Sequence, residues 1–316
     1  MGRGNNRPRR GSLQVWPRKR AKSQNVRIGS WKDSGKTQLS GFAGYKIGMT
    51  QISYINKVQG ARGRNKELVT PATIIECPPL KLFSIRFYKR SPYGNRIVSE
   101  HLVKNPDKHL ERRIYMPKQH QEKQIEKYDD IRILCSTQPY LTSLSKKSPE
   151  LIEIAISGPL DKKLEFAKSL ANKEIKASDV LQESQIIDVH AVTKGKGLQG
   201  AVKRFGVALK QKKSEKKKRS TGNLGAFTPR KVLFTVAHPG QMGYHTRTEF
   251  NKPIIKISNE LEKINPKQGF TRYGFIKNEY VLIRGSTPGP SKRLIKMTNP
   301  QRNNKPLNIE LRMIKK

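Results

Sequence analysis

The stretch IIDVHAVTKGKGLQGAVKRFG, residues 186–206, decides between two fold classes for this chain of 316 residues. A strand-like apolar run leads into Gly195, Gly197 and Gly200, which have the spacing G-x-G-x-x-G. A dinucleotide-binding α/β fold needs a helix after this spacing, a second parallel strand, and an acidic residue about 20 positions on that binds the ribose. Here the chain continues into a lysine-rich run whose only acid is Glu215. The spacing therefore indicates glycines that let the backbone approach a phosphate. A plain glycine turn and, more remotely, a nucleotide-using enzyme stay open as alternatives.

The charge of the chain points to the same kind of partner. There are 65 Lys and Arg residues against 24 Asp and Glu, a formal net charge of +41. Repulsion of this size opposes compaction unless a polyanion neutralises it, so we expect a nucleic acid as the partner. A hydrophobic content of 34% still allows a buried core.

The sequence gives no sign of a membrane or secretory protein. No apolar run approaches the roughly 18 residues of a membrane span, and the N-terminus lacks the apolar core of a signal peptide. We therefore expect a cytoplasmic protein without a membrane partner.

The positive charge is concentrated in two stretches. Residues 1–38 hold 11 basic residues against Asp33 alone, and residues 194–231 hold 13 against Glu215 alone. Neither has enough apolar positions to fold by itself, so we expect two arms that contact the nucleic acid, the second one two-limbed. A disordered surface loop is the alternative for the second stretch. Residues 100–190, in contrast, hold 15 acidic and 15 basic residues, and we expect their surface not to bind a polyanion.

Short strand-like runs dominate the remainder of the chain. Residues 270–276 and 279–285 are separated by two residues, which predicts a tight hairpin. A helical pattern starts near Asp161, with Leu160, Leu164, Ala167 and Ala171 on one face. Many short strands with Gly and Pro between them favour a barrel or sandwich. The predicted strands are 50–56, 72–77, 83–88, 131–135, 151–156, 186–192, 231–237, 253–258, 270–276, 279–285, 293–297 and 308–314.

Sites for catalysis, metals or cofactors are not indicated. Cys77 and Cys135 lie 58 residues apart without metal-ligand spacing, so we expect small buried side chains in strands. His190 alternates within a strand pattern and is expected to be structural. Residues 29–37, GSWKDSGKT, have five residues between their two glycines where a P-loop has four. We expect no enzyme activity, no cofactor, no metal and no small-molecule substrate.

Aromatic residues lie between cations and glycines in a way that suits RNA. Phe205 follows Lys203 and Arg204, and Phe227 stands in the turn-like sequence GNLGAFTPRK. Lysine and arginine neutralise phosphates, and a flat ring can stack on an unpaired base. Phe205 has a core position as an equally good alternative, whereas Phe227 fits a core poorly.

Four blocks of this sequence, in order, resemble the universal large-subunit ribosomal protein family L-three in its archaeal form. They are GFAGYKIGMTQI (41–52), DVHAVTKGKGLQGAVKRFG (188–206), GNLGAFTPRKV with AHPGQMGYHTRTEFN (222–251), and GFIKNEYVLIRGSTPGPSKRLIKM (274–297). The resemblance implies an α+β, β-rich fold: a split β-barrel of the translation-protein type with an inserted α/β domain and long basic extensions.

The resemblance also implies a function. Such a protein binds 23S rRNA near its 3′ end, nucleates assembly of the 50S subunit beside neighbouring large-subunit proteins, and sends an extension toward the peptidyl-transferase centre. Phe227 would lie near the extension tip, and Gly195, Gly197 and Gly200 would let the backbone approach phosphates. The expected rRNA contacts are Arg9, Arg10, Arg18, Lys19, Arg20, Lys194, Lys196, Lys203, Arg204, Lys216, Lys217, Lys218, Arg219, Arg230 and Arg247.

The implied organisation divides the chain into six parts. They are a basic N-terminal arm (1–38), the first part of the barrel (39–99), a near-neutral inserted α/β domain (100–184), a barrel strand (185–193), the internal basic extension (194–231), and the remaining barrel with a C-terminal hairpin (232–316).

Two positions depart from eukaryotic members of the family. These have tryptophan where this chain has Phe227, and phenylalanine stacks but cannot donate an indole hydrogen bond. They have a histidine, methylated in some members, where this chain has Lys196, so that modification is not expected. A chromatin-type DNA-binding protein is the alternative function that the charge leaves open.

Overall fold

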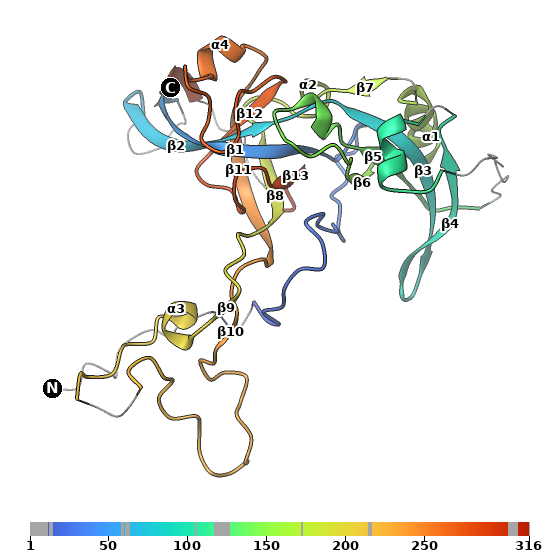
Figure 1. The fold of residues 1–316 in the computed structure, drawn as a ribbon. Coiled ribbons are helices and arrows are strands. Elements are labelled where there is room, and N and C mark those ends of the chain that lie inside the picture. The colour runs from blue at the N-terminus through green and yellow to red at the C-terminus, as the bar shows by residue number, and fades with distance from the viewer. Residues whose placement is uncertain are drawn as a thin grey trace. The chain divides into compact units, whose positions relative to one another are not determined.

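The computed structural model describes residues 12, 15–57, 60, 64–104, 106–116, 127–171, 173–213, 217–302 and 309–315 (Figure 1). The chain divides into two compact units. The smaller unit is Met1–Lys22 with Val192–Thr246, and the larger unit is Ser23–Ala191 with Arg247–Lys316.

Seven strands form the main sheet, and six of them pair in a closed ring. The order is β13-β8-β11-β12-β2-β1-β14, and β1 also pairs with β13, so the hydrogen bonding returns to its start. The strands are β1 (Gly41–Asn56), β2 (Glu67–Glu76), β8 (Ile186–Val192), β11 (Thr246–Ser258), β12 (Tyr280–Arg284), β13 (Leu294–Thr298) and β14 (Ile309–Ile314).

Strand β1 holds this ring together because it pairs with β2, β13 and β14. Its neighbours approach closely at Gly44, where an added Cβ would lie 2.6 Å from the Glu76 carbonyl oxygen and 2.7 Å from Ile75 Cγ2. Any side chain at this position would push β2 away from β1.

A second sheet lies in the same unit and has the order β4-β3-β5-β6, with β7 on β3. Its strands are β3 (Leu80–Ser91), β4 (Gly94–Leu102), β5 (Asp130–Ser136), β6 (Leu151–Ala155) and β7 (Glu174–Ile175). Helix α1 (Leu160–Ser169) packs on the shared core through Leu160, Leu164 and the fully buried Ala167. The unit also contains the one-turn α-helices α2 (Ala177–Val180) and α4 (Leu261–Ile264) and the 3-10 helices η1 (Lys108–Arg112) and η2 (Pro139–Leu141). One hydrophobic core runs through both sheets.

The predicted class, β-rich with α+β content, is confirmed, as are the strands at 131–135, 151–156 and 186–192 and the helix near Asp161. Strand β3 and most of β4 fall in the segment 39–99 expected for the first part of the barrel, and they pair within the second sheet.

Two predicted strands are wrong. Residues 270–276 form turns joined by the single bridge Phe270–Gly274, so the predicted hairpin with 279–285 does not form. Residues 231–237 form no strand either, and Val232, Leu233 and Phe234 are exposed there. An apolar run becomes a strand only where another strand offers it a hydrogen-bonding edge.

Buried cysteine and histidine side chains of the larger unit follow the sequence prediction with one exception. Cys77 and Cys135 are free and buried, and burial raises the pKa of both thiols. Cys135 lies in strand β5 as expected, whereas Cys77 follows the end of β2 and lies outside any strand. His190 is half-buried between Thr248 Oγ1 (2.9 Å from Nδ1) and Thr298 Oγ1 (3.1 Å from Nε2). Burial lowers its pKa, so this imidazole is a structural hydrogen-bonding group.

Glu76 explains why residues 270–276 form a loop. Its carboxylate, fully buried at the end of β2, accepts hydrogen bonds from the Lys277 N–H (2.9 Å), the Asn278 N–H (3.0 Å) and Asn278 Nδ2 (2.9 Å). The Tyr273 hydroxyl also donates to it. One buried charge thus fixes the loop, because each donor offsets part of its desolvation.

We expect Glu76→Gln to lower the free energy of unfolding by about 2–4 kcal/mol, since several donors lose a charged acceptor inside the core. Urea unfolding measures this change. The exposed Glu262→Gln is the control and should stay within about 0.5 kcal/mol of the wild type. Equal stability of both variants would contradict the role given to Glu76.

Lys296 is a cation buried in the main sheet. Its side chain in β13 is 6% exposed, and Nζ donates to the Val26 carbonyl oxygen at 2.6 Å. Burial lowers the pKa of Lys296 from 10.5 to about 8. The ammonium therefore attaches the segment before β1 to the ring, at the expense of desolvating a charge.

This shift predicts a pH dependence of stability. Between about pH 8 and 10.5 the unfolded chain keeps the Lys296 proton while the folded protein has released it. The free energy of unfolding should therefore rise with pH across this window, by up to about 3 kcal/mol. Lys296→Met should lack this rise when the two proteins are compared by urea unfolding at pH 7.5, 9 and 10.5. Parallel pH profiles would contradict the buried ammonium.

Candidate nucleic-acid interface

The internal extension begins after β8 and returns to β11 as two paired limbs, so it runs over residues 193–245 rather than the expected 194–231. The Thr193 N–H donates to the His245 carbonyl oxygen at 2.9 Å. Further on, the Lys196 N–H donates to Met242 O and the Met242 N–H to Gly197 O, both at 2.9 Å. Strand β9 (Leu198–Gln199) then pairs antiparallel with β10 (Gly240–Gln241). Beyond this ladder, helix α3 (Ala201–Phe205) is followed by a long irregular loop (Figure 1).

The glycines of the G-x-G-x-x-G segment serve different purposes. Gly197 has φ +67°, and an added Cβ would meet open space, as it would at Gly200, the N-cap of α3. Gly195 lies against Tyr244, whose Cβ would be 3.6 Å from its own. A helix does open after the last glycine, but β9 pairs antiparallel with β10, so the described residues lack the βαβ unit of a dinucleotide fold.

Gly243, which no sequence motif singles out, is the most constrained glycine of the extension. It has φ +72°, and an added Cβ would lie 2.1 Å from the Lys194 carbonyl oxygen. Its place in a GYH segment did not distinguish it from other glycines, because the close approach joins positions 49 residues apart.

Arg204 is occupied inside the extension. Its Nε donates to Gln241 O (3.1 Å) and one terminal nitrogen to His238 O (2.8 Å). These bonds tie α3 to the returning limb, and burial lowers the pKa of Arg204. Arg204 therefore has a structural role, which is to join α3 to the returning limb of the extension.

A clasp of aromatic and cationic side chains joins the N-terminal segment to the extension. The Arg18 guanidinium lies 4.8 Å from the Trp16 ring centroid and 4.4 Å from that of Phe205. Trp16 also meets Phe234 edge-on at 5.7 Å. Phe205 is 6% exposed, so the core alternative is correct for this ring. We call Trp16, Arg18, Phe205 and Phe234 the clasp.

Backbone hydrogen bonds extend this contact. The Ala21 N–H donates to Tyr244 O at 2.8 Å, and His245 Nδ1 lies 2.9 Å from Lys19 O. The Arg20 guanidinium lies 5.4 Å from the Tyr244 ring centroid. The two basic stretches that are far apart in sequence thus form one unit.

The other expected contacts fall into three groups. Arg18 and Arg247 are half-buried like Arg204, whereas Arg9, Arg10 and Lys216 lie outside the described residues. The exposed cations are Lys19, Arg20, Lys194, Lys196, Lys203, Lys217, Lys218, Arg219 and Arg230. Since no compact core lies beneath most of them, these cations are available to phosphates.

Phe227 lies open on the extension, with its ring 79% exposed. The Arg230 guanidinium stacks on one side of it, 5.0 Å from the centroid. Other apolar side chains of the extension are also exposed, namely Leu198, Leu209, Leu224, Val232, Leu233 and Phe234. Apolar side chains exposed among cations are typical of a surface that a partner covers.

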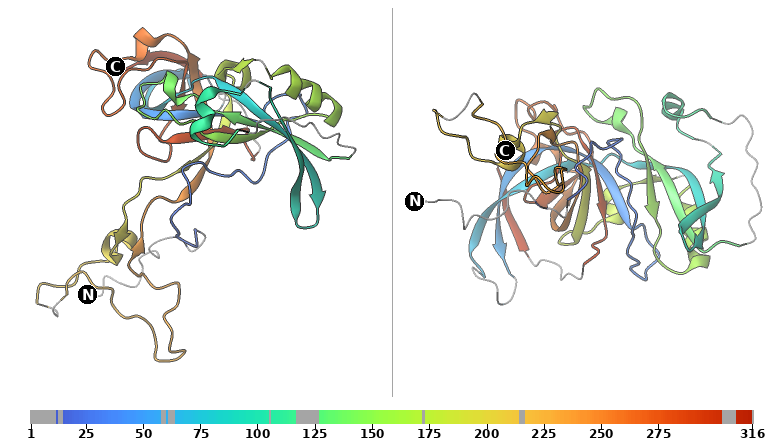
Figure 2. Two further views of the ribbon diagram at one scale, coloured as in Figure 1. Left: turned by 45° about the vertical axis from the view of Figure 1, so that its right-hand side comes forward. Right: turned by 90° about the horizontal axis from the view of Figure 1, so that it is seen from below.

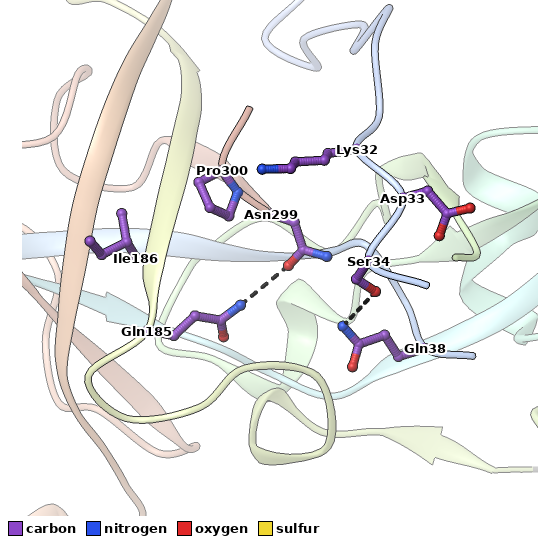
Figure 3. A pocket seen from close by; sticks show the side chains of 8 residues that line it. All are labelled: Lys32, Asp33, Ser34, Gln38, Gln185, Ile186, Asn299 and Pro300. Carbon is purple, nitrogen blue, oxygen red and sulfur yellow. Dashed lines mark hydrogen bonds between the residues drawn. The ribbon is translucent and has the colours of Figure 1, made fainter. Parts of the chain in front are cut away.

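A pocket of the larger unit offers no competing chemistry (Figure 3). It encloses about 260 Å³ and is lined by Lys32, Asp33, Ser34, Gln38, Gln185, Ile186, Asn299 and Pro300. Two of its side-chain pairs are hydrogen-bonded to each other: Gln185 Nε2 donates to Asn299 Oδ1 (3.2 Å) and Gln38 Nε2 to Ser34 Oγ (3.1 Å). The lining holds no nucleophile with an adjacent base.

The described part of the chain has neither a candidate metal site nor a helix suited to a membrane. No group of three or more His, Cys, Asp or Glu residues there could hold a metal ion. No helix there is long and apolar enough to cross a membrane.

A β-rich fold together with a basic extension that exposes cations and an aromatic ring is typical of structural proteins of the nucleic-acid-binding class. Comparison with known proteins identifies the family. The profile described as "Ribosomal protein L3" matches residues 1–313, and the chain belongs to this family of structural, non-enzymatic proteins. The resemblance inferred from the four sequence blocks is thereby confirmed.

Archaeal relatives named "Large ribosomal subunit protein uL3" match over nearly their whole length. The one from Archaeoglobus fulgidus is 46% identical over 302 residues, which are 92% of this chain and 91% of the relative. Those from Methanobrevibacter smithii and Methanocaldococcus jannaschii are each 42% identical, over 94% and 97% of this chain and 92% and 95% of the relatives.

The clasp generates a prediction about the free protein. Arg18→Ala removes a cation held between two rings, an interaction of about 1–2 kcal/mol when partly desolvated. The Ala21 amide should then exchange its hydrogen about 5–30-fold faster, measured by mass spectrometry on peptides covering residues 15–22. Arg27→Ala, an exposed cation after the clasp, is the matched control and should leave this exchange unchanged. Unchanged exchange in Arg18→Ala would show that the clasp does not hold the segment.

Proposed function

We propose that this chain is a structural constituent of the large ribosomal subunit in the cytoplasm and binds 23S rRNA directly. The observation that carries the proposal is the extension, where many exposed cations share one segment with the exposed ring of Phe227 and no compact core lies beneath most of them. Family membership supports rRNA over DNA as the polyanion.

The parts of the extension suit different features of an RNA. Lys194, Lys196 and Lys203, with the basic run 217–219, neutralise phosphates. Open space at Gly197 and Gly200 lets RNA backbone approach the chain. Phe227, backed by Arg230, offers its other face to an unpaired base.

The finer parts of the proposal rest on the family resemblance. The binding site lies near the 3′ end of 23S rRNA, binding nucleates assembly of the 50S subunit, and Phe227 marks the end that approaches the peptidyl-transferase centre. The closed ring of β1, β2, β12, β11, β8 and β13 serves as the split translation-type barrel, and the second sheet with α1 as the inserted domain. Because β3 and β4 pair in that sheet, we place the start of the insert near residue 79 rather than 100. Neighbouring large-subunit proteins are the further partners; no membrane or small-molecule substrate is involved.

The clasp indicates that part of the RNA-binding unit is ordered before RNA binds. Since the N-terminal segment from Trp16 already contacts the extension within one unit, part of the ordering entropy is lost before RNA binds. Preorganisation of this kind raises affinity without adding a contact to the RNA.

Sedimentation tests the proposal. The protein should travel with large subunits at moderate salt and leave that fraction after RNase digestion. Its affinity for a 3′-terminal 23S rRNA fragment should fall about 10³–10⁵-fold between 50 and 200 mM salt, if roughly 6–10 phosphates are neutralised. Duplex DNA at equal phosphate concentration is the competitor and should displace the rRNA poorly. A free pool insensitive to RNase, or equal competition by DNA, would contradict the proposal.

A further inference from the structure

The hairpin formed by β3 and β4 extends into solvent beyond the core. Tyr88 is the last buried residue of β3, and residues 89–98 are all exposed. The ladder nevertheless continues to the end, where Ser91 pairs with Gly94 and its Oγ donates to Gly94 O at 2.7 Å. Figures 1 and 2 show this hairpin projecting from the second sheet. We call residues 89–98 the finger.

Two cations of the finger are placed where they repel each other. Lys89 and Arg96 are directly opposite in the register, so both side chains lie on the same face. Like charges in directly opposite cross-strand positions are destabilising. Arg90 adds a third cation, and residues 89–99 contain no acid. The nearest acids already have partners: Glu100 accepts hydrogen bonds from Ser84 and Arg86, and Asp129 Oδ2 accepts one from the Arg90 N–H at 2.7 Å. An anion between Lys89 and Arg96 would turn this repulsion into attraction.

The end of the finger presents an aromatic ring. Tyr93, the second residue of the two-residue turn formed by Pro92 and Tyr93, is fully exposed, and Ile97 and Val98 are 46% and 48% exposed. A two-stranded hairpin without a core on either face is marginally stable in water. The finger therefore has both the charge and the exposed apolar area that a partner would cover.

We propose that the finger is a second rRNA contact, separate from the extension: Lys89 and Arg96 bind a backbone phosphate between them, and Tyr93 stacks on an unpaired base. The proposal rests on the proposed function. It adds a contact on the second sheet, most of whose strands lie in the charge-neutral segment 100–190, where the sequence predicts no contact with a polyanion. RNA fits better than an acidic peptide because a fully exposed flat ring beside cations suits a base and a phosphate, while the finger has no pocket for a peptide side chain.

Directed cleavage from the finger tests the position of the RNA. Cys77 and Cys135 are buried at 1% and 0% exposure, so an iron chelate attaches only to an introduced cysteine. Tyr93→Cys subunits should cut 23S rRNA at one compact set of nucleotides. Phe227→Cys on the extension is the positive control, and Tyr115→Cys, fully exposed in the same unit as the finger, is the matched comparison.

The outcomes separate the two proposals. Cleavage from Tyr93→Cys above that from Tyr115→Cys supports the finger. Cleavage from Phe227→Cys without cleavage from Tyr93→Cys overturns the finger and leaves the proposed function in place. No cleavage from any position overturns both. Contact with a neighbouring protein would appear as crosslinks from Tyr93→Cys to protein in place of rRNA cleavage, and it overturns the finger.

A salt titration tests the phosphate site. The double variant Lys89→Gln/Arg96→Gln should flatten the dependence of log affinity on log salt by about 0.7–0.9 for each phosphate lost. Its thermal midpoint should stay equal or rise, because a like-charge pair has been removed. Lys162→Gln/Lys168→Gln, which removes the same charge from exposed positions of α1, should change the slope less. Equal slopes in the two variants would overturn the phosphate site.

Discussion

The neighbouring positions of β8 and β11 in the main sheet are the constraint on which the basic extension depends. The chain leaves β8 after Val192 and re-enters at Thr246, the first residue of β11. Because antiparallel neighbours begin and end side by side, the 53 residues from 193 to 245 must leave and return at one place. The hydrogen bond from the Thr193 N–H to His245 O continues this pairing into the extension. A long loop lacking most regular structure is therefore held at both ends, which limits the entropy lost when RNA orders it.

The fold also separates charges that pair internally from charges that do not. In the second sheet, Arg132 and Lys163 bind Asp130, and Arg132 also reaches Glu153 at 2.9 Å. The extension has almost no acid, and its cations Lys194, Lys196, Lys203 and Arg230 are exposed to solvent. Cations and acids that pair neutralise one another, whereas exposed cations in a segment almost without acid supply a long-range field that attracts a polyanion. The cations of the finger resemble the exposed cations of the extension, although the finger projects from the sheet that holds the paired charges.

Glycines and aromatic rings divide in the same manner between internal and external roles. Phe205 and Phe227 both stand beside cations in the sequence, yet Phe205 is buried in the clasp and Phe227 is open. Position 243 must be glycine because the Lys194 carbonyl oxygen of the facing limb leaves no room for a Cβ. A Cβ at Gly197 or Gly200 would meet open space. Two phenylalanines, or two glycines, in similar local sequence can therefore have opposite roles. One holds the extension together, and the other stays accessible to a partner.

The sequence by itself determined the β-rich class, the two basic stretches, the near-neutral segment and the family, because these depend on composition and on motifs that are contiguous in the chain. Only the tertiary structure decided which cations brace the protein, since Arg204 bonds to carbonyl oxygens more than 30 positions away. It also decided that residues 270–276 form a loop, because their conformation follows from a buried carboxylate 197 positions before Tyr273. Local patterns report the preferences of a segment, but a buried charge or a missing strand edge overrides them, and both depend on residues that are neighbours only after folding.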